Sequence, residues 1–171
     1  MIQRAETSAR GNEPEGLMAT IRASSEVEIR APLERVWDWV ADIERSPTWQ
    51  AGLLEVRVHE RDGEGRATVC ESRSDAKVRS VTSVVRLHYR EPTLLTWIQE
   101  HGDLKSVEGS WELEDLGRRR TRATYSLVVD PGRVLGMVFR GPLASLAREM
   151  LVNSRPGELK RAVEQAGATS R

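Results

Sequence analysis

The stretch EIRAPLERVWDWVADIERSPTWQ, from Glu28 to Gln50, is the most informative about the fold, because a strand pattern changes to a helix pattern within it. In residues 20–30, apolar and polar side chains alternate, which predicts a strand with one covered face. Pro32 suits the first turn of a helix. Apolar residues then recur at helical spacing from Val36 to Ile43. We therefore predict a strand, an amphipathic helix and a short second helix or turn at 46–49.

Three of the five tryptophans of the chain lie in this stretch. Trp37 and Trp39 are two positions apart, which turns a helix by about 200°, so only one of them is expected to meet the core. We interpret the stretch as a packed helical corner that closes one end of a sheet. Ligand contact from Trp49 is a secondary alternative.

The rest of the chain predicts an antiparallel sheet followed by a helix. Six further strand-like runs occupy 53–60, 67–74, 76–90, 93–102, 105–115 and 121–130. Turn residues rather than helices separate them, which indicates a meander of hairpins. Helical periodicity returns after Gly132, with breaks or kinks expected near Pro142 and Pro156. The predicted fold class is α+β: a curved seven-stranded antiparallel sheet, two short helices after the first strand, and a long C-terminal helix.

Length and composition indicate one domain without disulfides. The chain has 171 residues, of which 1–18 are polar and aperiodic, so we expect a disordered extension, a domain at 19–167 and a disordered tail at 168–171. The single cysteine, Cys70, excludes an internal disulfide. We expect a cytoplasmic protein, since neither a signal peptide nor an apolar run of about 20 residues is present. A monomer and a homodimer both remain open.

The charge balance argues against nucleic-acid binding. Lys plus Arg and Asp plus Glu number 26 each. The one basic cluster, Arg118, Arg119, Arg120 and Arg122, lies beside a glycine without interleaved aromatic residues, so we interpret it as a solvated turn.

Several segments resemble the polyketide cyclase/dehydrase family of the START-related, birch-pollen-allergen-like helix-grip (SRPBCC) superfamily. They are VEIRAPLERVWDWVADIERSPTWQAGLLEVRV at 27–58, YREPTLLTW at 89–97, GDLKSVEGSWELEDLG at 102–117, TRATYSLVVDPG at 121–132, and ELKRAVEQAG at 158–167. The resemblance implies a cavity between sheet and C-terminal helix. Relatives bind lipids, sterols, polyketides, quinones or plant hormones, and some cyclise or dehydrate polyketides. Three residues match family positions that we interpret as structural: Trp49, Gly109 and Trp111. The family has no shared catalytic motif, so the resemblance implies no catalytic residue.

The predicted ligand-binding residues combine the apolar sheet face, a few polar groups near it, and the facing helix. They are Tyr89, Leu95, Trp97, Gln99, His101, Trp111, Tyr125, Leu127, Leu146, Met150 and Asn153. If it faced inward, His101 could act as an acid or base, because the histidine side chain ordinarily titrates near neutrality, but a solvent-exposed position at a strand end is the preferred interpretation. The catalytic residues stay unknown. We expect no metal site, because the three histidines lack ligand spacing, and no cofactor.

Two functions follow from this inventory. The first is a module that binds a hydrophobic small molecule such as a lipid or polyketide, in a mostly apolar cavity of about 300–1,000 Å³. The second is a polyketide cyclase or dehydratase that uses inward polar groups as acid and base. The small number of such groups favours binding.

Overall fold

The computed structural model describes residues 20–75, 79–133 and 149–169. The first part of the chain forms strand β1 (Ile21–Ile29), helix α1 (Leu33–Ala41) and the 3-10 helix η1 (Ile43–Thr48). Six strands follow: β2 (Leu53–Arg61), β3 (Ala67–Asp75), β4 (Ser80–Arg90), β5 (Leu94–Gly102), β6 (Ser106–Gly117) and β7 (Arg120–Asp130). A π-helical turn, η2 (Glu149–Asn153), precedes the C-terminal helix α4 (Arg155–Thr169).

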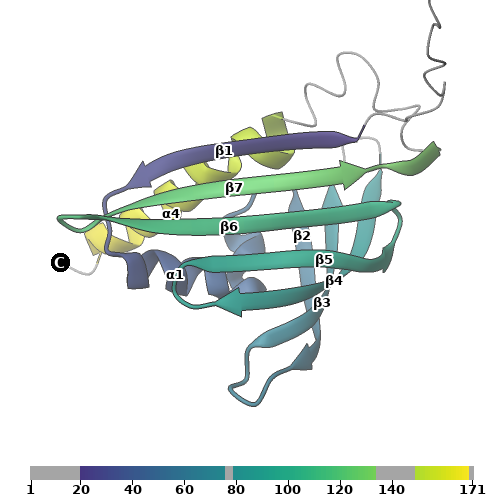
Figure 1. Ribbon diagram of the computed structural model, residues 1–171, viewed down its shortest axis with the longest axis horizontal. Helices are drawn as coiled ribbons and strands as arrows, with labels where there is room; N and C mark the ends of the chain where they lie inside the picture. Colours follow the sequence, from purple (N-terminus) through teal and green to yellow (C-terminus); the bar gives the residue numbers. More distant parts are fainter. Residues whose placement is uncertain (1–19, 76–78, 134–148, 170–171) are drawn as a thin grey trace, which may run out of the picture.

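All seven strands belong to one antiparallel sheet in the order β1-β7-β6-β5-β4-β3-β2 (Figure 1). The first strand lies beside the last, with Ile21 opposite Val129 and Ile29 opposite Thr121. Bulges interrupt the register between β2 and β3 and between β4 and β5. Bulges bend strands and increase their twist, which curves the sheet. The predicted fold class is confirmed.

Both α1 and α4 lie on the same face of the sheet, behind the strands in Figure 1. Val36 and Val40 of α1 and Leu159 and Val163 of α4 are almost completely buried in the core that this arrangement creates. The prediction that only one of the two tryptophans of this helix is buried in the core is confirmed, and that residue is Trp37. Trp39 is only half-buried.

The C-terminal helix is tied to β1 by polar contacts along its length. The Arg30 amide donates to Glu164 Oε1 at 2.9 Å, and Lys160 Nζ donates to the Glu28 carbonyl at 2.9 Å. These contacts fix the position of α4 over the β1 side of the sheet.

Some details of the sequence prediction differ or lie beyond the described residues. The second helix, predicted at 46–49, begins earlier, because η1 spans Ile43–Thr48 with Pro47 inside it. The helical break falls at Ser154, and Pro156 is the second residue of α4. The predicted extension at 1–18 and Pro142 lie outside the described residues, and α4 itself continues to Thr169.

The arginine cluster forms the turn between β6 and β7. Gly117, Arg118 and Arg119 all have positive φ angles, 72°, 53° and 57°. Arg120 then pairs with Glu28 at 3.0 Å, and Arg122 with Glu114 at 2.6 Å. This geometry is that of an exposed turn whose flanking charges are neutralised by surface partners.

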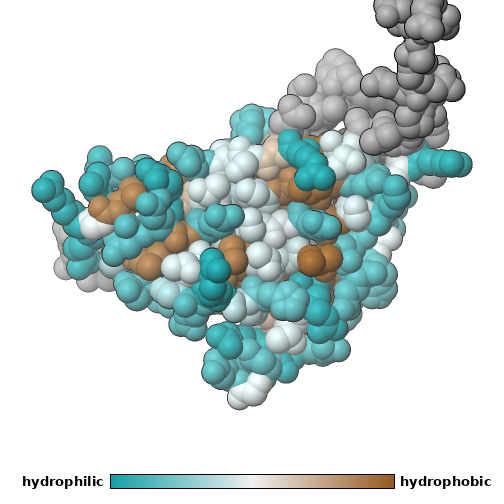
Figure 2. All heavy atoms as spheres, viewed as in Figure 1, coloured by the Kyte–Doolittle hydropathy of each residue, from teal (hydrophilic) through white to brown (hydrophobic). Residues whose placement is uncertain are grey.

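The outer face of the sheet is mostly hydrophilic (Figure 2). Ion pairs cross its strands, for example from Arg86 to Glu100 at 2.6 Å and to Glu60 at 3.4 Å. Among the described residues, the large apolar side chains that stay exposed are Leu54 and Ile98. No helix in the described part of the chain is long and apolar enough to cross a membrane.

Candidate functional site

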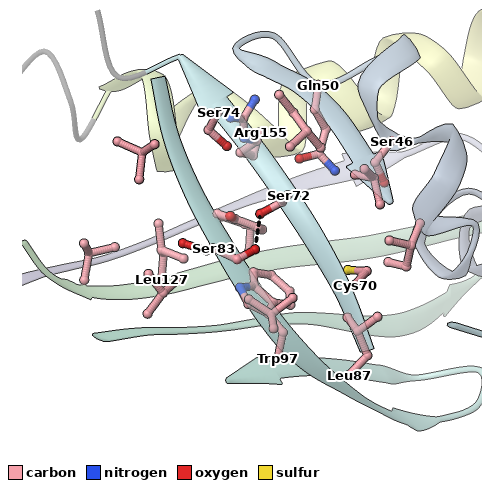
Figure 3. Close-up of a pocket in the computed structure, with 18 of the residues that line it drawn as sticks. Ser46, Gln50, Cys70, Ser72, Ser74, Ser83, Leu87, Trp97, Leu127 and Arg155 are labelled. Carbon is pink, nitrogen blue, oxygen red and sulfur yellow. Dashed lines mark hydrogen bonds between the residues drawn. The ribbon is translucent and has the colours of Figure 1, made fainter. Parts of the chain in front are cut away.

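A cavity of about 200 Å³ lies over the inner face of the sheet (Figure 3). Its wall includes five of the predicted residues: Leu95 and Trp97 from β5, Trp111 from β6, and Tyr125 and Leu127 from β7. Alternation along each strand places these side chains on one face, since residues i and i+2 of a strand point the same way. Their role as ligand contacts stays a prediction.

The aromatic side chains of this wall form a continuous row. Ring centroids are 5.6 Å apart for Trp97 and Tyr125, 4.8 Å for Tyr125 and Trp111, and 6.3 Å for Trp111 and Trp49. Tilted rings at these separations attract one another beyond their burial. The row gives the cavity a rigid apolar floor. Trp49, at the end of the row, carries a buried indole Nε1 that has no hydrogen-bond partner among the described residues.

Gly109 explains how Trp97 lies in this wall. A Cβ atom at position 109 would overlap the Cζ2 and Cε2 atoms of Trp97 and lie 2.8 Å from its Nε1. The indole therefore lies directly on the backbone of β6, an approach that only glycine permits. The Gly-x-Trp pattern of β6 therefore has two roles. Gly109 leaves room for the indole of Trp97, and Trp111 packs on the same inner face of the sheet.

The cavity is smaller than predicted. We expected at least about 300 Å³, whereas its volume is about 200 Å³. The reason is that the large rings of Trp97, Trp111 and Tyr125 occupy the space that a curved sheet would otherwise enclose.

Polar side chains gather on another part of the wall, which the sequence analysis missed. Gln50, Ser72, Ser74, Ser83 and Arg155 all line the cavity and are labelled in Figure 3. One signal was available for β3. In CESRS, Cys70, Ser72 and Ser74 alternate with charged residues, so the small side chains share one face.

Arg155 and Glu158 form a buried ion pair beside the cavity. Their side chains are 6% exposed each, and Arg155 Nη1 lies 2.8 Å from Glu158 Oε2. The same guanidinium nitrogen donates to the Ala51 carbonyl at 2.6 Å, and the Ala51 amide donates to Glu158 Oε2 at 3.3 Å. The pair therefore joins the start of α4 to the segment between η1 and β2.

The serines of β3 and β4 belong to a hydrogen-bond network. Ser83 Oγ lies 2.8 Å from Gln99 Oε1, and Gln99 Nε2 donates to the Leu104 carbonyl at 2.8 Å. Ser72 Oγ donates to the Ser83 carbonyl at 3.3 Å. Gln99 thus supports the wall through Ser83.

Two titratable groups of the wall are protonated at neutral pH. Burial raises the pKa of the Cys70 thiol to about 11. Burial also raises the pKa of Tyr125, although the positive charge of nearby Arg155 opposes the rise. Neither group is a base near neutrality.

The polar candidates Gln99 and His101 do not line the cavity. The bulge between β4 and β5 places Gln99 opposite Val85 and His101 opposite Val84. Val85 lines the cavity and Val84 does not. The side chain of Gln99 therefore points to the inner face of the sheet, where it bonds to Ser83, while that of His101 is exposed. Strand alternation predicts that Gln99 and His101 share a face, and this prediction fails at the bulge. The exposed position preferred for His101 is confirmed.

Tyr89 and Asn153 also lie away from the cavity wall. Tyr89 meets the ring of Trp37 edge to face at 6.3 Å, and its hydroxyl donates to the Ala67 carbonyl at 2.7 Å. Asn153 is exposed, and its amide donates to Glu149 Oε2 at 2.7 Å. Leu146 and the side chain of Met150 lie outside the described residues.

The described residues offer no obvious metal ligands. Within 20–75, 79–133 and 149–169, no group of three or more His, Cys, Asp or Glu side chains could hold an ion. The other two histidines, His59 and His88, lie in β2 and β4 and do not line the cavity.

Comparison with known proteins agrees with this architecture. Residues 29–154 match the family model described as polyketide cyclase/dehydrase and lipid transport. No curated protein matches the chain significantly.

Solved structures share the fold at low sequence identity. A START superfamily protein from Mycobacterium smegmatis is 22% identical with a TM-score of 0.71, over 85% of this chain and 98% of its own. A protein from Thermus thermophilus is also 22% identical, with a TM-score of 0.71, over 85% of this chain and 99% of its own. The Zhui aromatase/cyclase from Streptomyces sp. R1128 is 18% identical, with a TM-score of 0.66, over 86% of this chain and 95% of its own. The resemblance predicted from the sequence is confirmed.

Proposed function

The chain belongs to the polyketide cyclase/dehydrase and lipid transport family, and we propose that it binds a small, mostly apolar molecule in the cavity over its sheet. The observation that carries this proposal is the composition of the wall. An aromatic row forms one part and a polar cluster another, while the cavity between them is about 200 Å³. Ligand sites usually combine apolar surface with a few orienting polar groups.

A cyclase or dehydratase, such as the aromatase/cyclase among the structural neighbours, is less well supported. Such chemistry needs an acid or base with a suitable pKa beside the substrate. Cys70 and Tyr125 are held protonated by burial. Arg155 is already paired with Glu158. Among the described residues of the wall, the remaining carboxylate is Asp75, at the end of β3.

The test is a cavity-filling substitution with a control on the opposite face of the same strand. Val85 of β4 points into the cavity, whereas His88 is exposed. Binding of an environment-sensitive hydrophobic dye is measured for the full chain and for Val85→Trp and His88→Trp. We expect micromolar binding to the parent protein and to His88→Trp, and loss of binding by Val85→Trp.

Stability separates a cavity from a filled core. In a solid core, Val85→Trp overpacks and costs about 1–3 kcal/mol. In a cavity, the ring enters empty space and the cost is smaller. Absence of dye binding by the parent protein, together with a large loss of stability in Val85→Trp, would overturn the proposal. Native mass spectrometry of protein purified from its own host, followed by extraction, would identify the natural ligand.

A further inference from the structure

The hydrogen-bond network behind the cavity wall has a fixed direction. The Leu104 carbonyl can only accept, so Gln99 must turn its amide nitrogen toward that carbonyl, 2.8 Å away. The amide oxygen of Gln99 then faces Ser83 Oγ at 2.8 Å. An amide oxygen also can only accept, so the Ser83 hydroxyl must donate its hydrogen to Gln99, away from the cavity.

The hydroxyl hydrogen of Ser72 is also used in a hydrogen bond within the wall. Its hydroxyl donates to the Ser83 carbonyl at 3.3 Å, the contact drawn between the two serines in Figure 3. A hydroxyl has one hydrogen and two lone pairs. With their hydrogens used within the wall, Ser72 and Ser83 keep lone pairs for the cavity that they line. Ser72 and Ser83 therefore accept hydrogen bonds from the cavity and do not donate to it.

The charges around the cavity do not favour an anion. Arg155 is the cation of the lining among the described residues, and Glu158 lies 2.8 Å from it. The carboxylate of Asp75 also lines the cavity. A ligand carboxylate would have to leave water for a site whose positive charge is already matched, which is unfavourable.

The cavity volume limits the size of the ligand. An engineered cavity of about 150 Å³ in another protein binds benzene, and this cavity measures about 200 Å³. One or two fused rings fit such a space, with their faces against Trp97 and Tyr125. Long acyl chains would extend beyond it.

We propose that the ligand is an uncharged molecule of one or two rings that donates a hydroxyl or N–H hydrogen to Ser83 and Ser72. This inference rests on the proposed function. Gln99 acts as a positioning residue, because its amide oxygen holds the Ser83 hydrogen and so makes Ser83 an acceptor.

The experiment compares three probes with the same ring system, measured by displacement of the hydrophobic dye from the full chain. 2-Naphthol donates a hydrogen bond, 2-methoxynaphthalene only accepts, and 2-naphthoate is an anion. One neutral hydrogen bond changes affinity by about two- to tenfold. We expect 2-naphthol to bind about fivefold to tenfold more tightly than 2-methoxynaphthalene, and 2-naphthoate to bind most weakly.

Variants assign this preference to the network. Ser83→Ala removes one of the two acceptors and should move the ratio of the two neutral probes toward one. Ser74→Ala removes another cavity hydroxyl, which is not bonded to Gln99, and should keep the ratio. Gln99→Met frees the Ser83 hydrogen to point into the cavity and should shift the ratio toward 2-methoxynaphthalene, an effect that simple loosening of the wall would not produce.

The outcomes separate this inference from the proposed function. Equal binding of the two neutral probes to the parent protein, or tightest binding of 2-naphthoate, overturns the inference while cavity binding stands. Binding of no probe and no dye overturns both. If Ser83→Ala fails to fold by circular dichroism, the ratios for the parent protein and for Gln99→Met still decide the question.

Discussion

The contact between Gly109 and Trp97 makes Gly109→Ala an informative substitution. A methyl group at position 109 would overlap two indole carbons of Trp97, and Gly109 does not have the positive φ that disfavours alanine. The backbone can therefore stay in place while Trp97 moves. Because the sheet lies beneath the ring, the indole can move only toward the cavity that it lines.

The expected cost follows from two opposing terms. Overpacking a well-packed contact costs about 1–3 kcal/mol, and the packing of Trp97 on Tyr125 is disturbed with it. Replacing glycine by alanine at a compatible position returns about 0.4–1 kcal/mol by restricting the unfolded chain. We expect a net loss of about 1–2 kcal/mol in the free energy of unfolding. Dye affinity should fall as well, because the displaced ring occupies cavity volume.

A double-mutant cycle tests this explanation by guanidinium denaturation. With Trp97→Ala already present, Gly109→Ala has nothing to overlap and should be neutral or stabilising by up to about 1 kcal/mol. Gly63→Ala serves as control, because a Cβ there meets no atom within 4 Å. Equal destabilisation by Gly109→Ala with and without Trp97 would refute the reasoning, as would unchanged dye affinity in the single variant.

Three further predictions concern the wall of the cavity. Trp111 is 2% exposed, so Trp111→Ala should lower the free energy of unfolding by about 3–5 kcal/mol; a loss below about 1 kcal/mol in denaturant titration would contradict its place in the core. Removing one partner of the buried Arg155–Glu158 pair, as in Glu158→Ala, should cost about 3–5 kcal/mol, whereas Arg155→Met combined with Glu158→Leu should cost less; equal costs in thermal unfolding would show that the charges do not matter. Burial raises the pKa of Cys70 from 9.0 to about 11, so the folded state keeps a proton that the unfolded state releases. The contribution of the Cys70 thiol to the free energy of unfolding is fully present below pH 9 and falls by up to about 1.4 kcal/mol per pH unit as the pH rises toward 11. Cys70→Val should remove this part of the dependence of the free energy of unfolding on pH, measured by denaturation across this range. An unchanged dependence on pH would contradict the burial of the thiol.

The order of the elements and the apolar half of the cavity could be predicted from the sequence alone. Alternation over 121–130 places Tyr125 and Leu127 on one face, and the same period applies to Leu95 and Trp97. Such patterns are local, because each strand reports its covered face through its own side chains. The family resemblance added the expectation of a cavity between the sheet and the C-terminal helix.

The direction of the polar side chains depends on contacts between strands and could not be predicted from the sequence. His101 is two residues from Gln99, so simple alternation predicts that they share a face. One extra residue in β5, opposite Val84 and Val85, reverses the direction of His101, since a shift of one residue exchanges the faces of a strand. The sequence of β5 alone does not reveal that bulge, which depends on pairing with β4.

The burial of Arg155 could likewise not be predicted from the sequence. In the sequence it is an arginine near a proline, which is typical of an exposed helix start. Its partners are Glu158, three residues later, and the Ala51 carbonyl, 104 residues earlier. Contacts at such separation arise only when the sheet curves and brings the segment after η1 to the start of α4. Local pattern therefore determined which residues are apolar and inward, while long-range packing determined which polar groups meet them.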